Sequence, residues 1–62
     1  MTLDDARNNI GRSVVYKPFK GCDKSQYEYG VITRVGDVFV FVRYGSEILS
    51  KATNPKDLRF MI

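Results

Sequence analysis

The segment spanning residues 30–44 constrains the fold of this chain more than any other feature. It contains two runs of β-branched and aromatic residues, separated by the pair Gly36-Asp37. Runs of this composition favour strands, and a glycine followed by aspartate between them is typical of a tight hairpin turn. In a chain of 62 residues, one such hairpin nearly determines the architecture, and we predict a small domain made mainly of β-strands.

The first ten residues predict a short helix. Thr2 is a suitable N-cap, and Asp5 follows it at the spacing of a capping box. Gly11 is a suitable residue to end the helix, because glycine readily adopts the backbone conformation of a helix C-terminus. Three apolar residues recur at helical spacing and therefore share one face: Leu3, Ala6 and Ile10.

Short strands and one helical turn are predicted along the rest of the chain. Asn54 and Pro55 suit the cap and the first position of a single helical turn near the C-terminus. The segment 17–27 is predicted to be a loop, and ordered loops of this length often carry function. The predicted strands are 13–16, 28–35, 38–44, 47–52 and 59–62.

The composition indicates one globular domain that covers residues 1–62. Hydrophobic residues make up 44% of the chain and charged residues 27%, close to the averages for soluble domains. No apolar run approaches the roughly 20 residues that cross a bilayer, and the N-terminal segment has acidic residues where a secretion signal would have lysines. We therefore expect no membrane interaction and a cytoplasmic location.

The chain lacks most of the side chains that support catalysis. It has no histidine, which is the commonest general base and metal ligand, and its one cysteine, Cys22, has no partner for an intramolecular disulfide. No glycine-rich phosphate loop is present, and the carboxylates considered for catalysis are well separated along the chain: Asp23, Glu28, Asp37, Glu47 and Asp57. We therefore expect no enzymatic activity, no cofactor and no metal, and we expect Cys22 to anchor the long loop as a small, partly buried residue.

The order of the predicted elements resembles the SH3-like barrel, including its Tudor and KOW-type variants. Five short strands, a long first loop and a single helical turn before the last strand match that layout over residues 11–62. Four segments are also similar to small uncharacterised proteins of bacteriophages and prophages: 15–22, 28–31, 38–44 and 55–58. The resemblance implies a five-stranded SH3-like barrel that follows an N-terminal helix at residues 1–10. It also implies a phage origin, and hence the host cell cytoplasm, and it implies no particular activity.

Strand alternation divides the predicted hairpin into two faces. Arg43 should reach solvent, so the opposite face should form the core, and it carries Val38, Val40, Val42 and Tyr44. By the same rule Ile32 lies on the outer face, together with Phe39 and Phe41. We expect the N-terminal helix to cover these three large apolar residues with its own apolar face, and the alternatives are a second copy of the chain or a partner protein. Strong strand curvature would instead break the alternation.

Two binding functions are consistent with these patterns. In the first, the chain is a non-enzymatic module that binds an unidentified protein, for example a host factor. The candidate residues for it are Phe19, Tyr27, Ile32, Phe39 and Phe41. In the second, basic residues bind phosphates with little sequence preference while Tyr27 stacks on a base. The candidate residues for it are Lys17, Lys20, Lys24, Arg34 and Arg43. The basic residues are scattered along the chain and the net charge is only +3, so protein binding is the favoured hypothesis.

Overall fold

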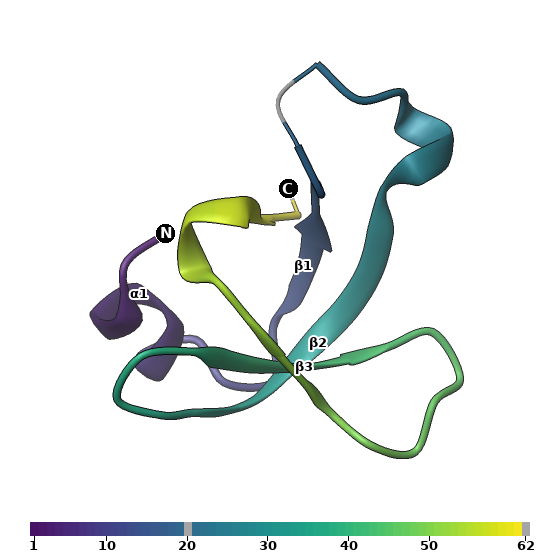
Figure 1. Ribbon diagram of the computed structural model, residues 1–62. Helices are drawn as coiled ribbons and strands as arrows, with labels where there is room; N and C mark the ends of the chain where they lie inside the picture. The colour runs from purple at the N-terminus through teal and green to yellow at the C-terminus, as the bar shows by residue number, and fades with distance from the viewer. Residues whose placement is uncertain (20, 62) are drawn as a thin grey trace.

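The computed structural model describes residues 1–19 and 21–61. Within this part of the chain the fold is mainly β (Figure 1), and five antiparallel strands form one sheet in the order β4-β3-β2-β1-β5. Because β4 and β5 lie at the two edges, the sheet is open, and the expected closed barrel is not confirmed. The elements are α1 (Leu3–Arg7), β1 (Ser13–Tyr16), the 3-10 turn η1 (Lys24–Gln26), β2 (Glu28–Val35), β3 (Val40–Tyr44), β4 (Lys51–Thr53), the 3-10 turn η2 (Pro55–Asp57) and β5 (Leu58–Phe60).

The hairpin of β2 and β3 is present, but its connection is longer than predicted. The backbone N–H of Gly36 donates to the carbonyl of Phe39 at 2.9 Å, so residues 36–39 all belong to the connection. A two-residue turn at Gly36-Asp37 is therefore wrong. β3 begins at Val40 rather than at Val38, and Val38 is exposed instead of lying in the core.

β1 and β2 have the predicted bounds, whereas β4 and β5 do not. The predicted strand 47–52 is wrong over residues 47–50, where the N–H of Glu47 donates to the carbonyl of Tyr44 at 3.1 Å and forms a turn. β4 therefore starts only at Lys51. β5 starts at Leu58, one residue earlier than predicted, and the predicted end at residue 62 lies outside the described residues.

The N-terminal helix has the predicted capping box. Asp5 N–H donates to Thr2 Oγ1 at 3.1 Å, and Thr2 N–H donates to the Asp5 carboxylate at 3.1 Å. The helix itself is shorter than the predicted segment, and it ends at Arg7. The following turn reaches Gly11, whose φ of 92° is costly for residues other than glycine.

The capping box predicts a pH dependence of stability. The hydrogen bonds from the backbone and the hydroxyl of Thr2 lower the pKa of the Asp5 carboxyl below its ordinary value. A carboxyl with a lower pKa in the folded chain stabilises it above the unfolded pKa, and this contribution is lost as pH falls through the folded pKa. We expect the midpoint temperature of unfolding to decrease as the pH falls below about 4. We expect Asp5→Asn to lower this midpoint temperature at neutral pH and to reduce its dependence on pH under acidic conditions. Circular dichroism melting curves at a series of pH values measure the midpoint temperature. The same decrease at acidic pH in Asp5→Asn as in the intact chain would contradict the prediction.

A β-bulge in β2 reverses part of the predicted alternation. Ile32 pairs with Val42, but Arg34 pairs with Phe41, so the register shifts by one residue between them and Thr33 is the extra residue. A one-residue shift moves the neighbouring side chains to the opposite face. Ile32 is consequently 0% exposed, and its predicted position on the outer face is wrong.

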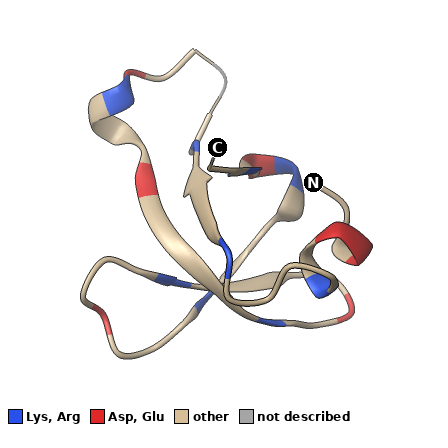
Figure 2. Cartoon of the chain, turned by 180° about the vertical axis from the view of Figure 1, so that it is seen from behind, with Lys and Arg blue, Asp and Glu red and all other residues tan. Residues whose placement is uncertain are grey.

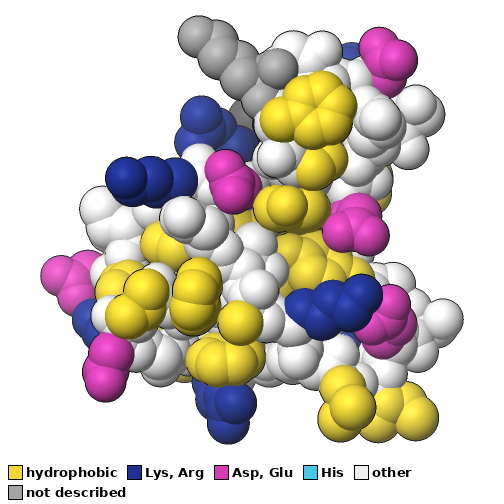
Figure 3. Space-filling view, viewed as in Figure 1, with side chains coloured by type: hydrophobic (Ala, Val, Ile, Leu, Met, Phe, Trp, Pro, Cys, Tyr) yellow, Lys and Arg dark blue, Asp and Glu magenta, His cyan; other side chains and the backbone are white. Residues whose placement is uncertain are grey.

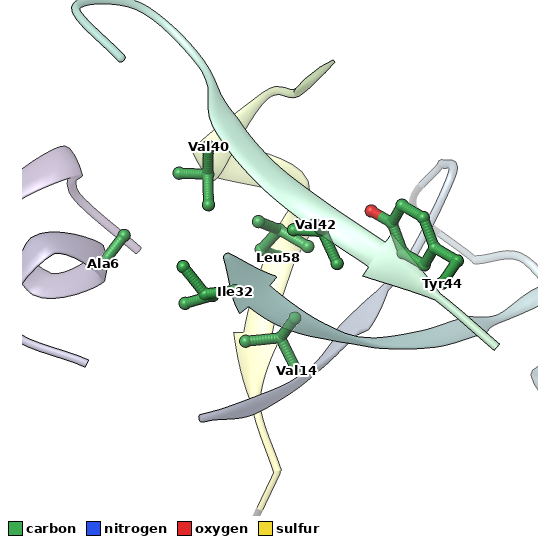
Figure 4. Close-up of a cluster of buried hydrophobic side chains, with 7 residues drawn as sticks. All are labelled: Ala6, Val14, Ile32, Val40, Val42, Tyr44 and Leu58. Atoms are coloured by element: carbon green, nitrogen blue, oxygen red, sulfur yellow. The ribbon is translucent and has the colours of Figure 1, made fainter. Parts of the chain in front are cut away.

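The core lies between α1 and the sheet, as Figure 4 shows for seven side chains from α1 and four strands. The predicted interior face is confirmed for Val40, Val42 and Tyr44. The whole cluster consists of Ala6, Val14, Ile32, Val40, Val42, Tyr44 and Leu58. At one end, the Tyr44 hydroxyl is hydrogen-bonded to Thr53 Oγ1 at 2.7 Å, and burial raises the pKa of Tyr44.

The helix packs into this core rather than over the two phenylalanines. Ala6 is fully buried in the cluster that includes Ile32, whereas Ile10 is exposed. Phe39 remains 44% exposed, so the expectation that one face of the helix covers Phe39 and Phe41 is wrong. Phe41 is instead half-buried beneath the guanidinium of Arg34, whose central carbon lies 4.1 Å from the ring centroid.

Candidate binding cleft

The connection between β1 and β2 extends away from the sheet (Figure 1). Its side chains form one wall of a cleft. The opposite wall consists of η2 and the start of β5. The space between the two walls is about 480 Å³, and we call it the loop cleft. Its lining residues are Lys17, Phe19, Gly21, Cys22, Tyr27, Lys56, Asp57 and Arg59.

The loop wall is held by hydrogen bonds within the loop. Cys22 N–H donates to the carbonyl of Phe19 at 3.3 Å, and Gly21 between them has a φ of 83°, which glycine tolerates best. The 3-10 turn η1 follows, and it brings the chain back to β2 through a hydrogen bond from Tyr27 N–H to the carbonyl of Lys24 at 3.1 Å. Cys22 is half-buried, as expected for a residue that anchors the loop.

The second wall follows from the predicted cap near the C-terminus. Asn54 Oδ1 accepts a hydrogen bond from Lys56 N–H at 2.9 Å, and Pro55 occupies the start of η2, as predicted. The Asp57 carbonyl accepts the N–H of Lys17 at 3.0 Å. This bond joins the end of β1 to η2, so the two walls of the cleft are linked through their backbones.

The charges around the loop cleft are mainly positive. Three cations and one carboxylate line it, namely Lys17, Lys56, Arg59 and Asp57. Within residues 1–19 and 21–61, none of these four side chains is within ion-pair distance of an opposite charge, because the two ion pairs there are Arg7–Asp4 and Lys51–Glu47. Unpaired cations beside a hollow attract an anionic group.

Lys17 is held over the ring of Tyr27. Its ammonium lies 5.1 Å from the ring centroid, which is within range of a cation–π contact. Both side chains are half-buried. One face of Tyr27 is therefore occupied, and the aromatic side chain most available to a ligand is Phe19, which is 55% exposed.

The structure separates the predicted protein-binding residues. Phe19 and Tyr27 line the loop cleft at the start of β2, whereas Phe39 lies in the hairpin connection at the opposite end of this strand. Ile32 is in the core and cannot take part in binding. The five residues therefore do not form one surface.

The predicted basic residues are also dispersed, as the blue segments in Figure 2 indicate. Lys17 lines the loop cleft, Arg34 borders a hollow beside the loop between β3 and β4, and Arg43 borders a third hollow on the outer side of the sheet. Lys24 is exposed on η1 and does not line the loop cleft. Lys20 lies outside the described residues.

Two groups of residues were missed by the sequence analysis. Lys56, Asp57 and Arg59 line the loop cleft because β5 pairs with β1, which places Arg59 opposite Val15. A pattern within 55–59 could not have indicated this, since the contact depends on a distant strand. The second group is Ile48 and Leu49, exposed 91% and 78%. The loop between β3 and β4 carries them, and Figure 3 shows apolar side chains protruding there at the lower right.

Neither a metal site nor a membrane-spanning helix is found in the part of the chain that the structure describes. Among these residues, no three Cys, Asp or Glu side chains gather as a metal site would require. No helix there is long and apolar enough to cross a membrane. No family model, no curated protein and no solved structure matches the chain.

Proposed function

We propose that this chain is a non-enzymatic binding module that acts by protein–protein interaction through the loop cleft. The observation that carries the proposal is the combination, in one hollow, of the exposed ring of Phe19 and three cations that lack ion-pair partners among the described residues. Concave sites that join an aromatic anchor to a few placed charges are typical of ligand recognition. The rigid sheet supports the loop that carries them, as is common for binding loops.

We further propose that the module is an SH3-like domain of phage origin that binds a host protein. Five antiparallel strands with a 3-10 turn before the last strand support the fold assignment. The proposed origin rests only on the resemblance that the sequence suggested for segments such as 15–22 and 38–44. On this proposal the partner is a host factor and the module works in the host cytoplasm.

The alternative, a weak nucleic-acid-binding protein, receives less support. Binding along a strand needs a continuous series of cations and aromatic rings free to stack. Lys17, Arg34 and Arg43 border three different hollows. In addition, one face of Tyr27 is occupied by Lys17.

A capture experiment with matched variants tests the proposed function. The intact chain is immobilised beside Phe19→Ala and Phe39→Ala, and proteins retained from a lysate of the host cells are quantified by mass spectrometry. Both phenylalanines are exposed, so neither substitution should unfold the chain. We expect a partner that Phe39→Ala retains and Phe19→Ala loses by about tenfold or more, as for an interface anchor.

Other outcomes would contradict the assignment to the loop cleft. Capture that Phe39→Ala abolishes and Phe19→Ala preserves would place binding at the hairpin connection. Retention of the same proteins by both variants would show that capture is unspecific. A lysate treated with nuclease provides the control for proteins that are bridged by nucleic acid.

A further inference from the structure

We propose that the loop cleft receives an acidic segment of the partner protein, with one carboxylate between Lys17, Lys56 and Arg59 and a neighbouring apolar side chain on Phe19. This inference rests on the proposed protein-binding function and names the chemistry of the partner. It depends on three features of the cleft: its charge, its aromatic ring and its limited size.

The charges that line the cleft favour binding of an anion. Its three cations face a single carboxylate, Asp57, and none of them is ion-paired within residues 1–19 and 21–61. A carboxylate from outside would form charge-assisted hydrogen bonds, and the planar group of Arg59 suits a bidentate contact. Recognition of acidic motifs by clustered cations is a recurrent mode of peptide binding.

Part of the site is organised before any ligand arrives. Lys17 is half-buried, and its ammonium is already held over Tyr27 at 5.1 Å from the ring centroid. Its backbone is fixed by the hydrogen bond to the Asp57 carbonyl. Ordering a long side chain on binding carries an entropic cost, and the contact with Tyr27 reduces this cost for Lys17.

The exposed ring of Phe19 favours a ligand that carries an apolar side chain next to that anion. A free phosphate or a lone carboxylate would leave this ring in water, whereas an aliphatic or aromatic side chain next to an acidic residue would cover it. Burial of apolar area contributes roughly 25 cal/mol per Å². An acidic residue beside a large apolar one therefore uses both parts of the cleft.

The dimensions of the cleft favour a peptide over a nucleic acid. A hollow of about 480 Å³ holds a few side chains and is within the size range of small-ligand sites. The cations that would extend a phosphate track, Arg34 and Arg43, border other hollows. Acidic peptides need no such track, because their charge is concentrated on one or two side chains.

Selection from a peptide library identifies the preferred ligand even while the partner protein is unidentified. Random dodecapeptides displayed on a surface are selected against the intact chain, and against the charge-reversed variant Lys17→Glu/Arg59→Glu. We expect the intact chain to enrich Asp or Glu next to Leu, Phe, Trp or Tyr, and the charge-reversed variant to lose this enrichment. Enrichment without acidic residues, or no enrichment at all, would overturn the proposal.

Quantitative binding then assigns the cations. A fluorescein-labelled peptide from the selection is titrated with the intact chain, with Lys17→Gln/Arg59→Gln and with Lys24→Gln, followed by anisotropy. Lys24 is the matched control, because it lies in the same loop and does not line the cleft. We expect about a tenfold or greater loss of affinity for the double variant and less than about a twofold loss for the control. Equal losses in both would overturn the proposal.

Cys22 offers an independent measure of occupancy. It is the only cysteine of the chain and it lines the cleft, so a bound peptide should slow its alkylation by iodoacetamide by about the fraction of protein that is occupied. The folded fraction of each variant is checked by circular dichroism. Full reactivity of Cys22 under saturating peptide would show that the peptide binds elsewhere and would overturn the proposal.

The last arm separates the failure of this inference from failure of the proposed function. A labelled oligothymidylate is titrated at about 50 and about 200 mM salt. Tighter binding of the oligonucleotide than of the peptide, with a steep salt dependence, would overturn both proposals in favour of nucleic acid. Neutral peptides that bind as well as acidic ones, with capture still lost in Phe19→Ala, would overturn the acidic ligand and leave the protein-binding function standing.

Discussion

Replacement of Ile32 by alanine should remove a large share of the stability of the chain and shift its urea unfolding midpoint to a much lower concentration. Ile32 is fully buried, packed in the cluster with Ala6, Val14 and Leu58. Truncation of such a side chain costs about 2–5 kcal/mol, from lost transfer energy and the cavity that remains. A chain of this size has a total stability on the order of 5 kcal/mol. Urea unfolding followed by circular dichroism measures the loss.

Val31→Ala is the matched control for this prediction. Val31 precedes Ile32 on the same strand, is half-buried and pairs with the outward residue Arg43. Its truncation should cost about 1 kcal/mol or less. The pair of variants tests the β-bulge directly, because a regular strand would place Val31 inside and Ile32 outside. A larger loss in Val31→Ala than in Ile32→Ala would contradict the observed register.

Gly30→Ala should also destabilise the fold strongly. A Cβ at residue 30 would lie 2.5 Å from the carbonyl oxygen of Arg43 and 2.7 Å from a methyl group of Val42. The carbonyl belongs to the paired strand β3 and cannot move without disturbing the ladder. Overpacking of this kind costs about 1–3 kcal/mol and sometimes more. We expect the midpoint of urea unfolding to fall accordingly.

Gly36→Ala provides the comparison for Gly30→Ala. There a Cβ would lie 3.2 Å from the edge of the Phe41 ring, which is a side chain able to shift. The exposed hairpin connection should therefore accept alanine with a change within about 0.5 kcal/mol. Equal destabilisation by both substitutions would contradict the explanation by close strand contact at residue 30.

Several elements could be predicted because they depend on residues close together in the chain. The capping box joins Thr2 to Asp5, and the second cap joins Asn54 to Lys56. β1 and β2 have their predicted bounds because their β-branched and aromatic composition favours extended backbone. For the candidate site, the same local information indicated the long loop and its residues Lys17 and Phe19.

The failures concern contacts between strands. Strict alternation predicted Ile32 outside, but the extra residue Thr33 shifts the register against β3, and the register depends on how both strands pack on the core. The wrong placement of Ile32 also led to the expectation that the helix covers Phe39 and Phe41, because an exposed Ile32 would have extended the apolar patch of these two residues. Once Ile32 faces inward, Ala6 packs with it and the patch loses its third member.

Local sequence patterns were sufficient to predict a small β-rich domain with one capped helix, a β2–β3 hairpin and a long basic and aromatic loop. These features follow from backbone preferences and hydrogen bonds over a few residues. The tertiary structure was needed to place Ile32 on the buried face and to show which residues lie opposite the loop. Pairing of β1 with β5 brings Lys56 and Arg59 to Lys17 and Phe19, because antiparallel pairing joins residues some forty positions apart. The loop cleft is a product of that pairing.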